Sequence, residues 1–282
     1  MLVSVYIPTK NRLELLKRAI QSVKEQTYNN IEIIVADDGS TDGTREYLAQ
    51  EMKKGLLKAI FHEKSLGACT ARNTAIMQAQ GDFVTGLDDD DYFQPNRLFD
   101  FVAAWKSAQM RGENISVFFD SVVVLTPGKN TVRNSWRKRI TYRMLRRRNL
   151  IGSQIFAPRN VFIDSGMFDS EMPMWQDWDL WLRVTKKFGD ALNISLASYV
   201  VDETHDFERI TKRNAEAVKN AQKRMLAKLS PVSLRQKAWI AAVTHGYPQV
   251  KPTTKEMFLL LGAGEIRAFF RSLPRFVKRV YP

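Results

Sequence analysis

Strand-like apolar runs and amphipathic helical stretches alternate along about the first ninety residues of the chain. Residues 2–7 alternate in polarity and predict a strand, and the apolar positions from Leu13 to Val23 recur at the spacing of a helix. The elements predicted next are strands at 31–36, about 57–61 and 83–87, with helices through 47–48 and over about 68–80 between them. This alternation predicts an α/β fold with a mostly parallel, Rossmann-like sheet flanked by helices.

The second half of the chain predicts fewer strands and ends in helices. An apolar run at 115–125 predicts a strand or a hairpin, and the positions after Asp177 have helical spacing. Amphipathic helices are predicted from about residue 211, with interruptions at Ser230-Pro231, at Gly246-Tyr247-Pro248 and at Pro274. We therefore expect a small helical region at this end of the chain.

Four consecutive carboxylates, Asp88 to Asp91, follow the strand predicted at 83–87. Like charges this close repel one another, so the run favours a cation among them. Oxygen ligands favour a hard divalent cation, Mg²⁺ or Mn²⁺, which binds carboxylates together with substrate phosphates. A solvated acidic turn is the alternative, but apolar residues flank the run on both sides. The run predicts a metal and diphosphate site at the sheet edge where open α/β sheets bind ligands.

A second acidic segment, Asp37-Asp38-Gly39-Ser40, ends the strand predicted at 31–36. Loops that follow neighbouring parallel strands lie at one edge of the sheet, so Asp38 is expected beside the crevice of the aspartate run. Its carboxylate can there accept a hydrogen bond from the imide N–H of a pyrimidine base. The alternative is a simple turn and helix cap, because Asp, Gly and Ser all favour turns.

The composition is ordinary for a soluble globular protein, with 44% hydrophobic and 26% charged residues in a chain of 282. The single cysteine, Cys69, excludes a disulfide framework within the chain and favours a reducing compartment. The sequence has no signal-peptide pattern and no apolar run near the ~20 residues that a membrane span needs. We expect a cytoplasmic protein, either free or peripheral on the inner face of the cell membrane.

The net charge of +13 is concentrated in two segments. Ten basic residues and no acidic one lie between Asp120 and Asp164, and five basic residues and no acidic one follow Glu265. Candidate partners are nucleic acid, an anionic membrane surface and a phosphorylated substrate. No known nucleic-acid motif occurs, so residues 133–148 favour a membrane or a phosphorylated acceptor. Residues 266–282 predict either an interfacial helix or a helix packed on the core or on a partner subunit, and the oligomeric state is left open.

Five motifs occur in an order that is typical of one enzyme family. They read VSVYIPTKNR, EIIVADDGSTDGT, GACTARN, GDFVTGLDDDD and QDWDLWLRV. In this order and spacing they resemble the family-2 glycosyltransferases with the GT-A fold, of the bacterial surface-polysaccharide type. The resemblance implies a catalytic domain at 1–210, with a nucleotide-sugar half at about 1–95 and an acceptor half at about 96–210. Residues 211–282 remain as a helical appendage that is a candidate for membrane contact.

The resemblance also implies how the donor and a metal are held. The donor-binding residues that it implies are Pro8, Thr9, Arg12, Asp38, Arg72, Asp88 and Asp89. For Arg72, an ordinary arginine on a helix surface is the alternative. The implied ligands of Mn²⁺ or Mg²⁺ are Asp90, Asp88 and His205, although a single histidine is more often structural. Arg209, in the same loop as His205, is a candidate to neutralise phosphate.

The resemblance places the general base at Asp177. This carboxylate would take the proton of an acceptor hydroxyl as that oxygen attacks the anomeric carbon opposite the leaving group, which inverts the configuration. The start of a helix favours an anion, and the neighbouring tryptophans exclude water. A helix N-cap is the alternative role and is compatible with catalysis. The family often has Glu before this Asp, and Gln176 here weakens any role for a second carboxylate.

These observations predict a metal-dependent inverting glycosyltransferase. It would move a single sugar from a nucleotide sugar, with UDP-sugar favoured, to a hydroxyl of a glycan or lipid-linked acceptor in cell-surface polysaccharide or lipopolysaccharide synthesis. The absence of a Q-x-x-R-W motif disfavours polymerisation. Two alternatives stay open. A nucleotidyltransferase would usually carry a glycine-rich phosphate loop, which PTKNR lacks, and a non-catalytic basic protein would bind a membrane or nucleic acid.

Overall fold

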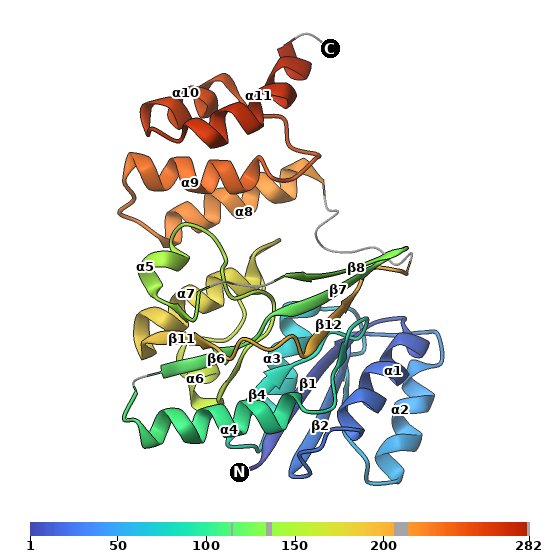
Figure 1. Ribbon diagram of the computed structural model, residues 1–282. Coiled ribbons are helices and arrows are strands. Elements are labelled where there is room, and N and C mark those ends of the chain that lie inside the picture. The colour runs from blue at the N-terminus through green and yellow to red at the C-terminus, as the bar shows by residue number, and fades with distance from the viewer. Residues whose placement is uncertain (114, 134–136, 206–213, 281–282) are drawn as a thin grey trace.

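The computed structural model has an α/β body beneath a stack of helices (Figure 1). It describes residues 1–282 except 114, 134–136, 206–213 and 281–282. We call the helices of residues 215–280 the helical stack. The body contains two sheets, and the larger one carries the elements that the N-terminal sequence pattern predicts.

An eight-stranded sheet forms the centre of the body. Its strands, in spatial order, are β3 (Lys58–Phe61), β2 (Ile31–Asp37), β1 (Val3–Thr9), β4 (Phe83–Gly86), β10 (Phe156–Pro158), β6 (Ile115–Phe119), β11 (Asp190–Asn193) and β9 (Arg139–Ile140). The first four strands pair in parallel, as does β11 with β6, whereas β10 and β9 run antiparallel to their neighbours. The prediction of a mostly parallel sheet is thus confirmed.

Both faces of this sheet are covered by helices. Val3, Val5 and Ile7 of β1 are buried in one hydrophobic cluster, and Tyr6, which points to the opposite face, belongs to the other. The first cluster includes residues of α1 (Leu13–Lys24), α2 (Thr44–Lys53) and α4 (Arg97–Met110). The second includes residues of α3 (Ala68–Gln78), α5 (Tyr142–Leu145), α6 (Arg159–Asp164) and α7 (Gln176–Phe188). Every residue of β1 is buried, so this strand is covered on both faces and lacks the exposed face that alternating polarity at residues 2–7 would give.

A smaller sheet contains β5 (Tyr92–Phe93), β12 (Tyr199–Asp202), β7 (Val122–Thr126) and β8 (Lys129–Arg133), in that order. The apolar run at 115–125 is therefore not a hairpin, because its first half forms β6 of the large sheet and its second half forms β7 of the small one. The turn between them is fixed by Asp120, whose Oδ2 atom accepts hydrogen bonds from the backbone and the hydroxyl of Ser198 at 2.7 and 2.5 Å. A buried side-chain anchor of this kind leaves no signal in the hydrophobic pattern.

The helical stack consists of α8 (Ala215–Lys228), α9 (Leu234–Thr244), α10 (Thr254–Gly262) and α11 (Ile266–Val280). Side chains of Asn214, Ser233 and Thr253 cap the first three of these helices. The interruptions predicted near Pro231 and Pro248 are confirmed, but Pro274 lies inside α11 and does not end it. Within the described residues, none of the helices has the length and apolar composition to cross a bilayer.

Candidate active site

The aspartate run follows β4 almost directly, so it lies at the edge of the sheet where the sequence predicts it. Gly86, the last residue of β4, lets the chain pass against Gln154 and Tyr6, because a Cβ atom there would lie 2.1 Å from Gln154 Oε1 and 2.5 Å from the Tyr6 hydroxyl. The backbone N–H of Leu87 then bonds the carbonyl oxygen of Tyr6 at 3.0 Å. The chain that leads into the four carboxylates is therefore held by the close packing at Gly86 and by the backbone hydrogen bond of Leu87.

Asp88 is held by two side chains that approach it from other elements. Arg72 Nη2 donates to Asp88 Oδ1 at 2.8 Å, and Gln154 Nε2 donates to the same oxygen at 3.2 Å. The side chain of Arg72 is only 13% exposed and its guanidinium lies 5.5 Å from the centre of the Phe168 ring. The alternative of an ordinary surface arginine is therefore wrong. The Asp88 carboxylate is still 23% exposed and can reach a ligand.

Asp89 connects the aspartate run to the loop after β1. Thr9 Oγ1 donates to Asp89 Oδ2 at 2.8 Å, and Arg12 Nη1 lies 3.1 Å from both Asp89 Oδ1 and Asp90 Oδ2. The predicted closeness of this loop to the run is confirmed. Burial raises the pKa of Asp89 to about 7, with Arg12 lowering it and Asp90 raising it further. Pro8 is buried inside β1, opposite Ala36 of β2.

Asp90 faces His205, whose Nε2 atom lies 3.3 Å from Asp90 Oδ2. An imidazole and a carboxylate at this distance, with the partly exposed Asp88 nearby in sequence, are donors that suit Mn²⁺ or Mg²⁺. Among the described residues no group of three potential ligands meets, so a bound cation would take its remaining ligands from water and substrate phosphates. Arg209, the candidate phosphate residue of the same loop, lies outside the described residues.

Asp91 has a structural role. Its Oδ1 atom accepts from the backbone N–H of Asp202 at 3.1 Å. Burial raises its pKa well above the ordinary value, and the charges of Asp88 and Asp90 add to this effect. Arg18, which sequence reasoning missed, donates from Nη1 to Asp202 Oδ2 at 2.5 Å and from Nη2 to the backbone oxygen of Asp90 at 2.6 Å. In the sequence, Arg18 is simply a basic residue on the polar side of α1, and nothing in the pattern predicts its contact with Asp90.

Asp38 lies at the end of β2, beside the loop that leads into α3. Its two oxygens accept hydrogen bonds from four groups: Ser65 Oγ at 2.6 Å, the backbone N–H groups of Leu66 at 2.7 Å and of Gly67 at 2.9 Å, and His62 Nδ1 at 2.9 Å. Burial raises the pKa of Asp38, but these hydrogen bonds outweigh it and hold the pKa below the ordinary value. The carboxylate is thus ionised and fixes the loop at 65–67, and its contact with a base stays a prediction.

Asp177 is the second residue of α7, one position from where the sequence places the helix start. Burial raises its pKa to about 6, while the backbone N–H group of Trp178 and the charge of Arg72 lower it. Asn149 Nδ2 donates to Asp177 Oδ2 at 2.8 Å. Arg72 bonds Asp88 and also interacts electrostatically with Asp177, so the predicted base lies near the aspartate run. Gln176 turns its amide toward the backbone oxygens of Met172 and Pro173.

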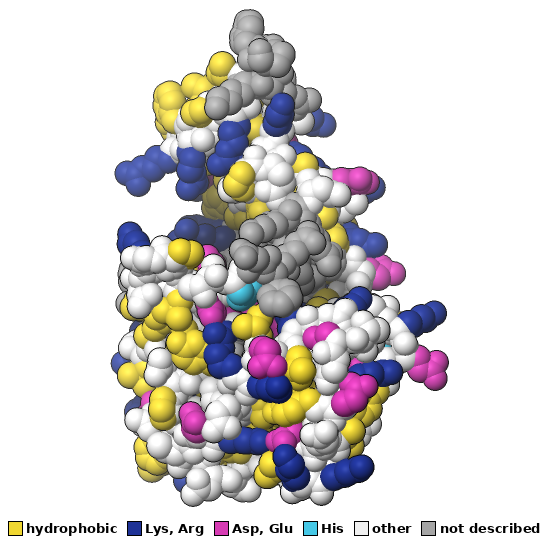
Figure 2. Space-filling view, turned by 90° about the vertical axis from the view of Figure 1, so that its right-hand side faces the viewer, with side chains coloured by type: hydrophobic (Ala, Val, Ile, Leu, Met, Phe, Trp, Pro, Cys, Tyr) yellow, Lys and Arg dark blue, Asp and Glu magenta, His cyan; other side chains and the backbone are white. Residues whose placement is uncertain are grey.

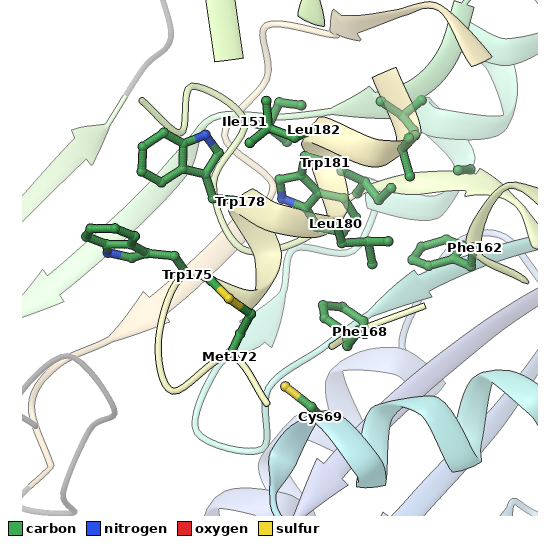
Figure 3. Packing of buried hydrophobic residues seen from close by; sticks show 14 of the residues in the cluster. Cys69, Ile151, Phe162, Phe168, Met172, Trp175, Trp178, Leu180, Trp181 and Leu182 are labelled. Atoms are coloured by element: carbon green, nitrogen blue, oxygen red, sulfur yellow. The ribbon is translucent and has the colours of Figure 1, made fainter. Parts of the chain in front are cut away.

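Three tryptophans hold the start of α7. Figure 3 shows Trp178 and Trp181 on the helix and Trp175 just before it, within one hydrophobic cluster. Trp178 Nε1 donates to the backbone oxygen of Leu145 at 2.7 Å, and Trp181 Nε1 to that of Gly152 at 2.8 Å. Trp175 has a φ of +62°, a left-handed conformation that is strained for an aromatic residue. The burial of Asp177 is the physical cause of its raised pKa.

Some of the basic side chains of residues 133–148 have partners within the protein. Arg139 forms an ion pair with Glu113 at 3.1 Å. Arg146 donates to three oxygen atoms of the segment 229–236, and the guanidinium of Arg147 lies 4.3 Å from the centre of the Trp239 ring. This part of the chain therefore joins the body to the helical stack. Residues 134–136 lie outside the described residues.

Comparisons with known proteins agree with this geometry. The family profile described as "Glycosyl transferase family 2" matches residues 4–169, more than half of the chain. The chain is 34% identical over 218 residues to the "Putative colanic acid biosynthesis glycosyl transferase WcaA" of Escherichia coli K12, covering 74% of this chain and 75% of that protein. It is 30% identical over 185 residues to the "UDP-Glc:alpha-D-GlcNAc-diphosphoundecaprenol beta-1,3-glucosyltransferase WfgD" of Escherichia coli, covering 66% of this chain and 70% of that protein.

Among solved structures, S. aureus TarS 1-349 in complex with UDP matches with a TM-score of 0.70 at 16% identity, covering 100% of this chain and 92% of that one. At this identity the match concerns the fold alone, and it agrees with the GT-A fold that the sequence predicts. The family profile spans the aspartate run, and the match to WcaA extends over three quarters of the chain. The chain belongs to glycosyl transferase family 2.

Proposed function

We propose that this enzyme transfers a single sugar from a UDP-sugar to a hydroxyl of a glycan or lipid-linked acceptor, with inversion and with the help of a divalent cation. The observation that carries the proposal is the pairing of two carboxylate sites across Arg72. This guanidinium bonds Asp88 of the aspartate run and interacts electrostatically with Asp177 at the start of α7. A nucleotide site and a base directed at one crevice are what a one-step displacement requires.

The donor half of the reaction is assigned to the sheet edge at the ends of β1, β2 and β4. Thr9, Arg12 and Asp89 form one bonded group there, and we assign them to the nucleotide. Arg72, Asp88 and Asp38 complete the donor site in this proposal. Asp90 and His205 would hold Mn²⁺ or Mg²⁺ together with water and the substrate phosphates, and the cation would supply Lewis-acid stabilisation to the departing diphosphate. The 3.3 Å approach of His205 to Asp90 supports this assignment. Asp88, the third ligand that the resemblance implies, is bonded to Arg72 instead.

The acceptor half is assigned to Asp177. Its pKa of about 6 leaves the carboxylate ionised near neutral pH while keeping it basic enough to accept a proton. The acceptor oxygen forms a bond to the anomeric carbon, and its proton moves to an Asp177 oxygen. The bond from the anomeric carbon to the diphosphate oxygen breaks, and its electron pair leaves with UDP. Attack opposite the leaving group inverts the configuration.

The names of the relatives support the choice of pathway and donor. WcaA is named for colanic acid biosynthesis, and WfgD is named for transfer from UDP-Glc to a sugar on diphosphoundecaprenol. We therefore propose a role in cell-surface polysaccharide synthesis, with a UDP-sugar as donor and an acceptor that is a glycan or a lipid-linked sugar. Such an acceptor favours action at the cytoplasmic face of the cell membrane.

The experiment is a screen of UDP-sugars with synthetic sugar-diphospholipid acceptors and Mn²⁺, in which UDP release is measured and the anomeric configuration of the product is read by NMR. We expect one UDP-sugar to give acceptor-stimulated UDP release and an inverted product. The Asp177→Asn variant should lose transfer, and the control variant Glu14→Gln, on the exposed side of α1, should keep it. Pyrophosphate release from nucleoside triphosphates, with no UDP-sugar used, would instead identify a nucleotidyltransferase.

A further inference from the structure

The last two helices of the helical stack expose large apolar side chains. On α10, Phe258 is 69% and Leu261 41% exposed. On α11, Ile266, Phe270 and Val277 are 48%, 63% and 45% exposed. We call these five residues the tip patch. Figure 2 shows hydrophobic side chains gathered at the tip of the helical stack, with Lys and Arg side chains around them. Large apolar side chains that share one end of a protein in this way mark a binding surface.

The opposite face of α11 is already packed against the rest of the helical stack. Ala268 is 5% and Ser272 3% exposed, and Ser272 Oγ lies 2.9 Å from His245 Nδ1. Arg275 Nη1 donates to the backbone oxygens of His245 and Tyr247, the latter at 3.1 Å. Packing on the core thus accounts for one face of this helix and leaves the exposed apolar face unexplained. The helix is anchored with its tip patch directed to solvent.

The tip patch is bordered by positive charge. Arg267 and Arg271 are exposed and lie one helical turn apart, beside Ile266 and Phe270. The sequence from 266 to 282 has five basic residues and no acidic one. The two neighbouring carboxylates are engaged elsewhere, since Glu256 pairs with Lys219 and Glu265 Oε1 accepts from Trp239 Nε1 at 2.7 Å.

We propose that the tip patch docks on an anionic lipid bilayer, with α10 and α11 lying in the membrane interface. Phe258, Phe270 and their neighbours would enter the boundary of the acyl chains, while Arg267 and Arg271 reach the headgroup phosphates. A second copy of the chain fits less well. In a two-fold interface the same arginines of both copies would meet, and this segment has no acid to pair with them.

The proposal also distinguishes between the two basic segments that the sequence offers as candidates for membrane contact. Arg139, Arg146 and Arg147 of residues 133–148 have partners within the protein, whereas Arg267 and Arg271 border an exposed apolar face. Contact with an anionic surface is assigned to the tip patch and the arginines beside it, because exposed basic and exposed apolar side chains occur together there. It does not depend on the donor chemistry and can be tested without any sugar substrate.

The experiment is co-sedimentation of the full chain with vesicles of phosphatidylcholine, with and without phosphatidylglycerol. We expect binding only to the vesicles that contain phosphatidylglycerol. The Arg267→Gln/Arg271→Gln variant should bind roughly thirtyfold more weakly, since two basic residues near the surface are removed. Phe258→Glu/Phe270→Glu should lose binding as well, because the apolar contribution is replaced by charge.

Matched controls separate this surface from general effects of charge and hydrophobicity. Lys106→Gln/Lys186→Gln removes the same charge from exposed positions of the body, and Phe99→Glu replaces an apolar side chain that is 55% exposed on α4. Both should bind vesicles like the wild type. Equal weakening by the controls, or no binding to anionic vesicles, would overturn the proposal. A concentration-dependent dimer that Phe270→Glu dissociates would also overturn it, because a second copy would then cover the tip patch.

Discussion

The indole nitrogen of Trp175 donates a hydrogen bond of 2.8 Å to the hydroxyl of Tyr247. The first residue lies just before α7 and the second just after α9, so this bond joins the segment that carries Asp177 to the helical stack. The charge of Asp177 contributes to the raised pKa of Tyr247, whose main cause is burial. The phenol and the candidate base are therefore near one another, and the helical stack contacts the segment that carries this base.

Replacing Tyr247 by Phe keeps the ring and removes the hydrogen-bond acceptor of Trp175. We expect kcat for transfer to fall about fivefold, the equivalent of ~1 kcal/mol, because the left-handed Trp175 is less firmly held next to Asp177. The KM for the UDP-sugar should not change, since the donor residues lie on other elements. Steady-state kinetics with the donor and the acceptor varied in turn measure both quantities. A rise in donor KM with unchanged kcat would argue against a positioning role for Tyr247.

The rate of transfer should depend on the protonation of Asp177. Its pKa of about 6 predicts that kcat/KM falls as the pH drops through this value, because the protonated carboxyl cannot accept the proton of the acceptor. In Asp177→Asn this acidic limb should vanish along with about 10²–10⁴-fold of the rate. UDP binding, measured on the same variant, should stay intact. A wild-type profile that is flat through this range would exclude Asp177 as the base.

The same raised pKa predicts a cost in stability. A carboxyl whose pKa is higher in the folded than in the unfolded protein stabilises the fold below its ordinary pKa of 3.8, and this contribution is lost as the pH rises to about 6. Asp177→Asn should therefore gain melting temperature over the wild type at pH values above 6 and gain less below 4. Thermal unfolding followed by circular dichroism across this range gives the comparison. A constant difference at every pH would mean that Asp177 is not held in an unfavourable environment.

Gly86 should tolerate no side chain. A Cβ atom would lie 2.1 Å from Gln154 Oε1, so Gly86→Ala must displace Gln154 from Asp88 and the Tyr6 hydroxyl from Gln154. We expect a loss of a few kcal/mol of stability, in the range for overpacking a core, together with weaker UDP binding. Gly262→Ala is the control, because the space around that residue is open and it lies in a helix. Similar denaturation midpoints for the two variants would show that the close packing at Gly86 carries no energetic weight.

The elements of the N-terminal half could be predicted because local physics fixes them. Val3 to Ile7 and Ile31 to Ala36 are apolar enough to form only buried strands, and the aspartates follow where a strand must end. Thr9 and Arg12 contact Asp89, and Arg72 contacts Asp88, which the placement of these motifs along alternating strands and helices anticipates.

The rest depends on tertiary contacts that leave no periodic signal. Arg18 and Gln154 contact the aspartate run, and Tyr247 contacts Trp175, from distant parts of the chain. None of the three belongs to one of the five motifs. β6 and β7 lie in different sheets, and the turn between them depends on the bond from Ser198 to Asp120. In the sequence, Asp120 cannot be distinguished from any other polar turn residue. The sequence could not show which face of α11 is buried and which is exposed, because apolar residues occur on both faces.

Metal-dependent nucleotide binding at Asp90 is tested most directly by calorimetric titration of UDP with and without Mn²⁺. We expect tight binding that requires the cation and is lost in Asp90→Ala, because Asp90 and His205 are the proposed protein ligands. Asp164→Ala, at an exposed position at the end of α6, should bind UDP like the wild type. UDP binding that depends on neither Mn²⁺ nor Asp90, or no UDP binding at all, would contradict the proposed donor site.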